Sequence, residues 1–313
     1  MNMYDLAIIG AGPVGLFATT FGNLHNLKVV TFEALDTVGG QVQMLFPNKN
    51  IKDVPAFSTI KGKQLIKNLK SDISNSIVAN TKIQSIERKE DYFLLNETYQ
   101  AKTILLTSGL GAFHPKKLPS KFDNPRVHYF MTDSQKYKGK TVAILGGGDS
   151  ALDWAFELAN ANCNVSLIHR RNEFRGLEST LEKLRSLKNV KILTPYLPQD
   201  INLQDNLLQL QLRSVGNSET QNIEIDNIFV AYGYKSDTHL LRKWQLDLDS
   251  EGVVVDTTMA TNIPGIYAAG DCVSYPGRVP MIALGFGEAQ VAISNIMAKL
   301  FPEKKITLHS TSI

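Results

Sequence analysis

Two stretches of the chain share one pattern of apolar and polar positions: a short apolar run, a glycine-rich turn, a segment long enough for a helix, and a second apolar run. Continuous apolar runs of this length, bounded by turn residues, are typical of strands buried in a parallel sheet. The predicted strand, helix and strand are residues 4–9, 16–25 and 27–32 in the first stretch, and 141–145, 152–161 and 164–168 in the second. The repeat predicts an α/β protein built from two units of one kind.

The first glycine turn has the spacing that dinucleotide binding requires. In the motif Gly-Ala-Gly-Pro-Val-Gly, Gly10 allows a tight turn, Gly12 leaves the backbone open to a pyrophosphate, and Gly15 lets the helix pack close to the strand. The phosphates would bind free amides at the helix N-terminus. Glu33 ends the second strand, where a carboxylate can accept hydrogen bonds from the adenosine ribose. A chance glycine-rich turn is the alternative, but strand, turn, helix and acid are all in register. The residues expected to bind this dinucleotide are Gly10, Gly12, Pro13, Gly15 and Glu33.

The second turn has the related GxGxxA form, but its second strand ends differently. Here the carboxylate is replaced by His169-Arg170-Arg171, with Arg175 expected one helical turn further on. A carboxylate would repel a 2′-phosphate, whereas guanidinium groups bind it bidentately. The second site is therefore predicted to prefer NADPH over NADH, the alternative being a solvated basic turn. The residues expected to bind NADPH are Gly146, Gly148, Asp149, Ser150, His169, Arg170, Arg171 and Arg175.

The remaining pattern predicts how these two units are connected. The expected segments are an irregular loop at 34–53, an amphipathic helix at 61–74, three short strands of an antiparallel insertion at 81–88, 92–96 and 99–106, an interdomain crossing at 114–140, a strand at 228–233, and a helix at 282–300. The lysines on the helix at 61–74 are interpreted as a solvated face rather than a partner site. Residues 1–113 and 234–313 would form one domain and residues 114–233 the other.

Asp271 follows a predicted strand and precedes the long apolar helix. An aspartate at such a position can simply cap a turn. We interpret Asp271 instead as a ligand for the ribityl chain of a flavin. The N-terminus of the helix would then point at the pyrimidine end of the ring, where reduction places negative charge.

Composition excludes several other classes of site. The chain has 313 residues, of which 43% are hydrophobic and 20% charged, which is ordinary for a globular protein with two cores. It shows no apolar stretch of about eighteen residues and no signal-peptide pattern, so we expect a cytoplasmic protein without a membrane segment. Cys163 and Cys272 are too far apart for a CxxC pair, and the six histidines lack metal-ligand spacing, so no metal is expected. A net charge of +3 does not argue for nucleic acid but is compatible with an acidic protein partner.

Several motifs together resemble the low-molecular-weight thioredoxin reductase superfamily. They are residues 10–15, Gly39-Gly40-Gln41, residues 146–152, residues 169–171, and Ala268-Ala269-Gly270-Asp271. The resemblance implies two Rossmann-like, three-layer ββα domains, an FAD domain that is discontinuous and an NADPH domain inserted into it. Thioredoxin reductases carry a Cys-x-x-Cys just before the second fingerprint, and residues 127–133 here have none. The branch that lacks this dithiol and has a C-terminal extension like residues 308–312 is the thioredoxin-reductase-like ferredoxin/flavodoxin–NADP reductase family.

The resemblance also implies roles for individual residues around FAD. Glu33 would hold the adenosine ribose, and Gln41 would contact the flavin portion beside Gly40, which is also expected to bind the cofactor. Phe46 would lie on one face of the ring, where tyrosine is common in the family. The other implied FAD contacts are Ile86 by the adenine, Phe113 near the cofactor, Asp271 on the ribityl chain and flavin, and His309 and Thr311 in a tail over the other flavin face. For the tail, a disordered terminus is the alternative.

The implied activity is electron transfer between NADPH and ferredoxin or flavodoxin. NADPH would pass a hydride to N5 of FAD, and the flavin would then pass single electrons to the carrier, without a catalytic side chain. The resemblance also implies a homodimer. Two alternatives stay open: an NADPH reductase of the same fold that acts on a disulfide or on oxygen, and a non-catalytic flavin and NADPH sensor.

Overall fold

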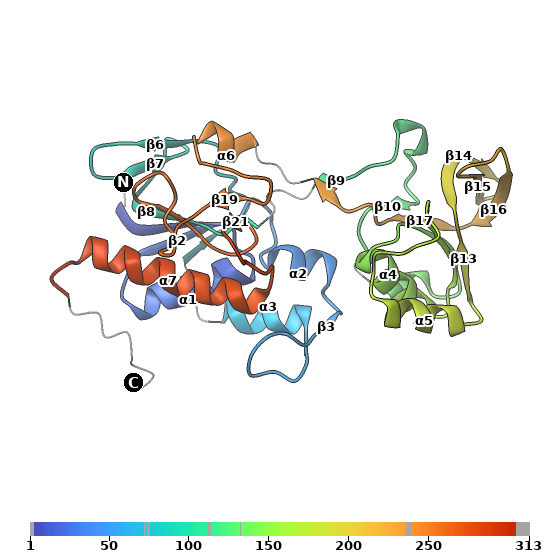
Figure 1. Ribbon diagram of the computed structural model, residues 1–313, viewed down its shortest axis with the longest axis horizontal. Helices are drawn as coiled ribbons and strands as arrows, with labels where there is room; N and C mark the ends of the chain where they lie inside the picture. Colours follow the sequence, from blue (N-terminus) through green and yellow to red (C-terminus); the bar gives the residue numbers. More distant parts are fainter. Residues whose placement is uncertain are drawn as a thin grey trace. The chain divides into compact units, whose positions relative to one another are not determined.

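The computed structural model describes residues 3–71, 73, 76–109, 111, 114–131, 133–235 and 239–304. The chain divides into two compact units. Unit 1 consists of Met1–Phe113 and Ser236–Ile313, and unit 2 consists of His114–Lys235. Unit 2 is therefore inserted into the sequence of unit 1 (Figure 1).

The core of unit 1 is a seven-stranded sheet in the order β5-β2-β1-β8-β7-β6, with β20 also paired to β8. Its strands are β1 (Met3–Ile9), β2 (Val29–Phe32), β5 (Ile77–Val78), β6 (Ile86–Arg88), β7 (Phe93–Leu95), β8 (Tyr99–Leu106) and β20 (Ile266–Ala268). The pairs around β1 and β2 are parallel, whereas β6, β7 and β8 pair antiparallel, as the pattern predicted. The strand β8 pairs with β7 through its first residues and with β20 through its last ones. Because β8 also pairs with β1, the strand β20 from the C-terminal part of unit 1 lies in the same sheet as the first repeat.

The helices of unit 1 are α1 (Pro13–Leu24), α2 (Gly40–Leu45), α3 (Gly62–Lys70), α6 (His239–Lys243) and α7 (Ile282–Leu300). They contribute apolar side chains to the buried clusters of the unit, although α6 has no fully buried residue. The rings of Phe17 in α1 and Phe286 in α7 lie 4.8 Å apart, so the first and last helices of the unit pack side by side (Figure 1). Short strand pairs lie outside the two main sheets. In unit 1, β3 (Asn50–Ile51) pairs with β4 (Ile60–Lys61), and β19 (Val253–Val254) pairs with β21 (Val273–Ser274). In unit 2, β9 (His114–Pro115) pairs with β18 (Tyr234–Lys235).

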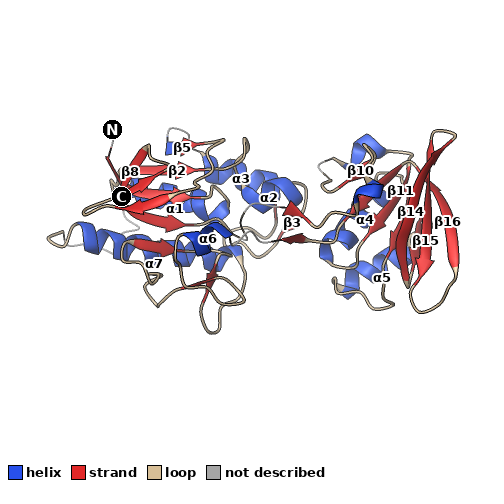
Figure 2. Ribbon diagram, turned by 90° about the horizontal axis from the view of Figure 1, so that it is seen from above, coloured by secondary structure: helices blue, strands red, loops and turns tan. Residues whose placement is uncertain are grey.

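Unit 2 has three layers, which are visible in Figure 2. The middle layer is a parallel sheet of β10 (Val127–His128), β17 (Asn227–Val230), β11 (Thr141–Leu145), β12 (Asn164–Ile168) and β13 (Val190–Leu193). One face carries α4 (Asp149–Asn160) and α5 (Glu178–Ser186), and the other carries the antiparallel sheet of β14 (Tyr196–Gln204), β15 (Leu207–Ser214) and β16 (Thr220–Ile225). Two short 3₁₀ turns, Ser120–Phe122 and Ser134–Tyr137, precede β11.

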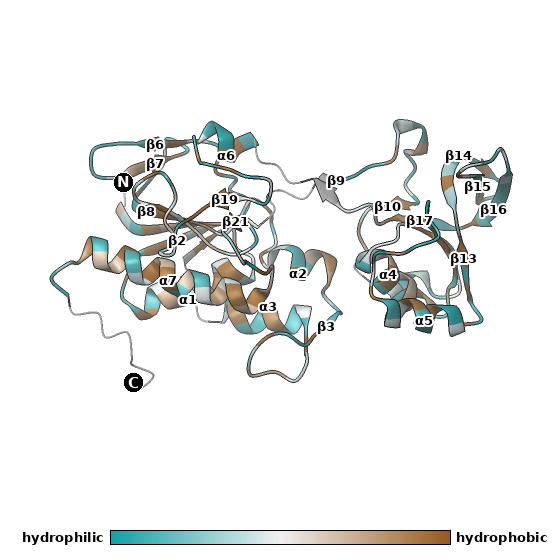
Figure 3. Ribbon diagram, in the orientation of Figure 1, coloured by the Kyte–Doolittle hydropathy of each residue, from teal (hydrophilic) through white to brown (hydrophobic). Residues whose placement is uncertain are grey.

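The apolar residues gather on the central strands, and the surface loops are polar (Figure 3). Leu6, Ile8, Leu105 and Ile144 are completely buried, in accordance with the predicted parallel strands. No helix within the described ranges is long and apolar enough to cross a membrane.

The structure corrects three of the predicted features. The loop expected at 34–53 contains α2, which starts after Gly39 in the left-handed region with φ 111°. The helix expected at 61–74 ends at Lys70, because Ser71 turns to extended backbone with ψ 137°. Residues 114–140 lie in unit 2, whose core takes up Leu118 and Phe122. Both glycine turns are shorter than expected, since α1 and α4 begin at Pro13 and Asp149.

Candidate functional site

Unit 1 contains a cavity of about 540 Å³ at the carboxyl ends of β1, β2 and β8. This is the end of a parallel sheet at which ligands bind in open α/β folds. The predicted residues that line the cavity are Gly10, Gly12, Pro13, Glu33, Gly40, Gln41, Phe46 and Asp271. Their segments come from both halves of unit 1, so the fold gathers at one place the residues that the motifs predicted separately.

The three glycines of the first turn have three different surroundings. Gly10 has φ 107°, and a Cβ there would lie 2.7 Å from the carbonyl oxygen of Thr107. A Cβ on Gly15 would lie 1.9 Å from the carbonyl oxygen of Gly10, so this glycine allows the contact between α1 and the turn. A Cβ on Gly12 would meet no heavy atom within 4 Å. The open space above Gly12, at the N-terminus of α1, could hold a pyrophosphate.

Glu33 lies at the end of β2 and ties the glycine turn to that strand. Its Oε2 accepts a hydrogen bond of 3.0 Å from the Ala11 amide, and its Oε1 accepts one of 3.0 Å from the Leu35 amide. Burial raises the pKa of Glu33, and the backbone hydrogen bonds oppose this shift. Each carboxylate oxygen has two lone pairs, so Glu33 can hold the turn and still accept a hydrogen bond from a ribose hydroxyl.

The short helix α2, which lies where a loop was expected, brings Gln41 and Phe46 to the cavity. Gly40 packs against the glycine turn, because a Cβ there would lie 3.2 Å from the Gly12 Cα. The ring of Phe46 lines the cavity, and the Lys49 ammonium lies 5.1 Å from its centroid. An aromatic ring of a ligand could stack on Phe46.

Other predicted residues are not brought to this cavity. Ile86 is half-buried against the core of unit 1, and Ile83 lines the cavity instead. Phe113, His309 and Thr311 lie outside the described residues. Trp244, which follows α6, also lines the cavity, and no local motif marked it because only the return of the chain to unit 1 places it there.

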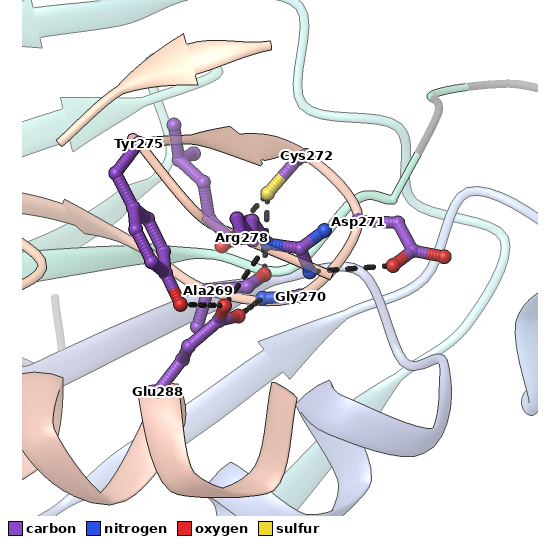
Figure 4. A network of polar contacts seen from close by, with 8 residues as sticks. Ala269, Gly270, Asp271, Cys272, Tyr275, Arg278 and Glu288 are labelled. Atoms are coloured by element: carbon purple, nitrogen blue, oxygen red, sulfur yellow. Dashed lines mark hydrogen bonds and ion pairs between the residues drawn. The ribbon is translucent and has the colours of Figure 1, made fainter. Parts of the chain in front are cut away.

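Asp271 follows β20 and lines the cavity, and a network of hydrogen bonds lies behind it (Figure 4). The centre of this network is the carboxylate of Glu288 in α7, whose side chain is 2% exposed. Its Oε2 accepts a hydrogen bond of 2.7 Å from the Gly270 amide. Its Oε1 accepts one of 2.8 Å from the Tyr275 hydroxyl and one of 2.9 Å from Arg278 Nε. Nη2 of Arg278 then lies 3.3 Å from Oδ1 of Asp271.

The network fixes the loop between β20 and α7. Burial, together with the hydrogen bond to Glu288, raises the pKa of Tyr275 to about 12, so its hydroxyl stays a donor. The motifs of the sequence marked Asp271 but not Glu288 or Arg278. The signal that could have found Glu288 was an acidic residue in the middle of the largely apolar helix at 282–300.

The second glycine turn, in unit 2, is built like the first. A Cβ on Gly146 would lie 2.6 Å from the carbonyl oxygen of Ala231, whereas a Cβ on Gly148 would meet nothing within 4 Å. Gly148 precedes the first residue of α4, so open space again lies at a helix N-terminus. This turn could hold a second pyrophosphate.

The loop after β12 folds back onto the second turn. The ring of His169 lies over Gly147, where an added Cβ would approach it to 2.5 Å. The Arg175 amide donates a hydrogen bond of 2.8 Å to the Gly147 carbonyl, and Asp149 Oδ1 accepts one of 2.9 Å from the Leu177 amide. Asp149 thus anchors this loop, while Ser150 is half-buried in the first turn of α4.

Positive charge gathers at the end of β12. Arg170, Arg171 and Arg175 are exposed. Burial lowers the pKa of His169, and the charges of these three arginines lower it further. The predicted helical spacing of Arg175 is wrong, because residues 169–177 form a loop, but that loop still places its charge near His169. A phosphate group could bind here.

The sequence pattern of the family described as pyridine nucleotide-disulphide oxidoreductase matches residues 4–295. The chain belongs to this family. The family resemblance and the fold class predicted from the motifs are confirmed, and members of the family use FAD and NADPH.

This oxidoreductase is similar over its full length to family members named ferredoxin–NADP reductase. It is 56% identical to a protein of Lactobacillus gasseri named ferredoxin–NADP reductase, covering 100% of both chains. It is 41% identical to ferredoxin–NADP reductase 2 of Bacillus subtilis, covering 100% of this chain and 97% of that one. The thioredoxin reductase structure of T. acidophilum has a TM-score of 0.81 at 23% identity, covers 96% of this chain and 100% of its own, and shares the fold.

The cysteines of this oxidoreductase do not form a dithiol. Cys163 lies in unit 2 and Cys272 in unit 1, and both are free and buried. The Cys272 thiol donates to the carbonyl of Ala269 over 3.2 Å, and burial raises its pKa to about 12. Burial raises the pKa of Cys163 as well. Because a thiol must ionise to attack a disulfide, neither cysteine is suited to that reaction.

The described residues fit the two cofactors that the family uses. Each of two helix N-termini has open space above a glycine, which suits a pyrophosphate. The carboxylate of Glu33 in unit 1 suits a ribose with free hydroxyls, and the arginines at residues 170–175 in unit 2 suit a ribose with a 2′-phosphate. No group of three or more metal-ligating side chains is found in the part of the chain that the structure describes.

Proposed function

We propose that this oxidoreductase transfers electrons between NADPH and ferredoxin, with FAD bound in the cavity of unit 1 and NADPH bound at the second glycine turn. The observation that carries the proposal is the pair of nucleotide-binding turns in a chain whose two cysteines are buried and lie in separate units. With no dithiol to relay electrons, the acceptor has to receive them from the flavin itself. The names of the full-length relatives support ferredoxin as that acceptor.

When bound, FAD accepts a hydride from NADPH at N5 and can release electrons one at a time, which an iron-sulfur carrier requires. The work of the chain is to bind and orient. In unit 1 we assign the pyrophosphate to the open space above Gly12, and the adenosine ribose to Glu33. Phe46 would cover one face of the ring, and Asp271 would hold the ribityl chain. The N-terminus of α7 also lines the cavity and favours negative charge there.

In unit 2 we assign the 2′-phosphate of NADPH to the arginine-rich loop at residues 169–175. A guanidinium group binds phosphate bidentately and keeps its charge at every physiological pH. The two units therefore select different nucleotides through the residues that end β2 and β12. His169 would contribute shape rather than charge, because its lowered pKa favours the neutral ring.

Three finer points belong to the same proposal. Flavodoxin could replace ferredoxin, since both carriers accept single electrons and the net charge of +3 favours an acidic partner. Two copies of the chain are proposed to form a homodimer, as the family resemblance implies. The cytoplasmic location stays a prediction from the sequence.

The test is anaerobic NADPH oxidation by the purified, FAD-loaded protein with alternative acceptors. We expect ferredoxin to accelerate the reaction, and thioredoxin with a disulfide substrate to leave it unchanged. Flavodoxin and oxygen are run in parallel. Faster turnover with a disulfide protein or with oxygen would contradict the proposal and favour a different reductase of the same fold. Flavin that NADPH does not reduce would favour a non-catalytic sensor.

A further inference from the structure

The carboxylate of Glu288 is surrounded by hydrogen-bond donors (Figure 4). The Gly270 amide, the Tyr275 hydroxyl and Arg278 Nε all point their hydrogens at its two oxygens, over 2.7, 2.8 and 2.9 Å. Arg278 is a permanent cation, and its Nε forms an ion pair with Glu288 although the Glu288 side chain is only 2% exposed. A buried charge is tolerated where it is paired and hydrogen-bonded, and Glu288 meets both conditions.

Arg278 balances that charge and passes the network on to the cavity. Its side chain is 9% exposed, with Nε on Glu288 and with Nη2 3.3 Å from Oδ1 of Asp271. One guanidinium thus lies between two carboxylates. Glu288 is buried and Arg278 is largely shielded from solvent, whereas the side chain of Asp271 is 46% exposed and lines the cavity. The three groups together carry one negative charge, and it belongs to the member that faces the cavity.

The same network fixes the backbone next to Asp271. Glu288 binds the Gly270 amide, so α7 is tied to the residue that precedes Asp271. The position of Asp271 and the electrostatic potential at this end of the cavity therefore depend on one buried carboxylate. Neither Glu288 nor Arg278 lines the cavity, so any effect of theirs on a bound ligand has to be transmitted through Asp271 or through the field of their charges.

We propose that Glu288 and Arg278 are positioning residues that hold Asp271 in place and set the reduction potential of the flavin through their balanced charges. This inference rests on the proposed binding of FAD in the cavity of unit 1. Reduction adds negative charge to the flavin, so a nearby cation favours the reduced form and a nearby anion disfavours it. Removing either member of the pair changes the net charge of the three groups by one unit.

The sign of the effect separates this role from a purely structural one. Glu288→Gln keeps the size of the side chain but removes one of the two carboxylates beside Arg278, so the net charge of the three groups rises from −1 to zero. The midpoint potential of the bound flavin is therefore expected to shift positive. Arg278→Gln leaves Glu288 uncompensated, and the potential is expected to shift negative. The double variant restores the wild-type net charge of −1, which Asp271 carries, and is expected to return the potential toward the wild-type value. A structural anchor alone would move both single variants in the same direction, or neither.

The experiment is a reductive titration of each purified, FAD-loaded variant against a reference dye, without NADPH or ferredoxin. Asp5→Asn is the matched control. Asp5 is also a carboxylate in an ion pair, with Lys102 at 2.9 Å, but it lies near the amino end of β1, away from the cavity. The midpoint potential of FAD bound to the Asp5→Asn variant is expected to equal that of FAD bound to the wild type. The affinity for FAD is measured on each apoprotein as a second readout, and the two Glu288 and Arg278 single variants are expected to bind FAD more weakly.

Each outcome decides the proposal. Equal potentials in all variants, or shifts of one sign in both single variants, would overturn it. If Glu288→Gln does not fold, Arg278→Gln alone decides, since an unchanged or positive shift contradicts the charge argument. If the wild-type protein binds no flavin, the proposed function fails together with this inference. If it binds flavin whose potential does not respond, only this inference fails.

Discussion

The same substitution at two glycines of the first turn is expected to have opposite consequences. An alanine at position 15 would place its Cβ 1.9 Å from the carbonyl oxygen of Gly10 and 2.7 Å from Thr107 Oγ1. A Cβ contact shorter than 3.0 Å requires one of the partners to shift, and the closer partner here is backbone. The helix α1 would therefore have to move by about 1 Å. Overpacking of this kind costs about 1–3 kcal/mol of unfolding free energy, and occasionally more.

An alanine at position 12 would meet no heavy atom within 4 Å, and the backbone there is extended with φ −71°. The unfolding free energy of the apoprotein should fall by no more than about 1 kcal/mol, the difference between glycine and alanine at a helix N-cap. The Cβ would, however, occupy the space assigned to the pyrophosphate. The affinity for FAD should fall about tenfold or more, which corresponds to about 1.4 kcal/mol.

The assays are urea unfolding of the two apoproteins and FAD titration followed by flavin fluorescence. Gly15→Ala should lower the unfolding midpoint strongly, and Gly12→Ala should leave it nearly unchanged while weakening FAD binding. Each variant serves as the control for the other, since both add one methyl group to the same motif. Equal losses of stability, or unchanged FAD binding by Gly12→Ala, would refute the reasoning.

Three further predictions follow from the described contacts. Replacing Arg170 and Arg171 together by alanine should lower kcat/KM for NADPH about a hundredfold or more, because each lost charged hydrogen bond costs about 1.5–3 kcal/mol. The value of kcat/KM for NADH should stay nearly unchanged. Equal losses for both nucleotides would contradict the assignment of the 2′-phosphate. Because burial raises the pKa of Glu33, protonation should weaken FAD binding at a pH above the usual glutamate range. The same protonation should stabilise the apoprotein, since a raised folded-state pKa gives stability at low pH that is lost as the pH rises through it; Glu33→Gln should remove both dependences in pH-series titrations. Cys163 and Cys272 should resist a thiol reagent in the native protein and react after unfolding. The Cys163→Ala, Cys272→Ala double variant should keep the proposed activity with ferredoxin. Loss of that activity in a folded variant would argue for a thiol mechanism.

The repeated nucleotide-binding unit could be predicted because its signals are local. Each apolar run lies within a few residues of its glycine turn, and the structure pairs β1 with β2 and β11 with β12 in the parallel register that the repeat implies. The position of Glu33 at the end of β2 followed from the same count. The difference between the acid of unit 1 and the arginines of unit 2 is likewise visible in the residues that end two equivalent strands.

Several elements were missed or misjudged in the prediction from sequence, for different reasons. The helix α2 has six residues and begins after Gly39 in the left-handed region, so neither length nor capping marked it. The sheet of β14 to β16 did carry a signal, since Leu208, Leu210 and Leu212 alternate with polar residues and are all buried. Arg175 was expected in a helix because of its spacing, but its amide binds the Gly147 carbonyl, and that contact is not local.

The sequence by itself determined the family, the two nucleotide-binding turns and the chemical difference between them, because strands, glycine turns and helix starts depend on short-range sterics and on apolar periodicity. Only the tertiary structure decided which residues support these turns. Glu288 and Gly270 are 18 residues apart, and nothing local indicates that a carboxylate in an apolar helix accepts that amide. A buried charge is tolerated only where donors from several segments converge on it, and their convergence depends on the whole path of the chain.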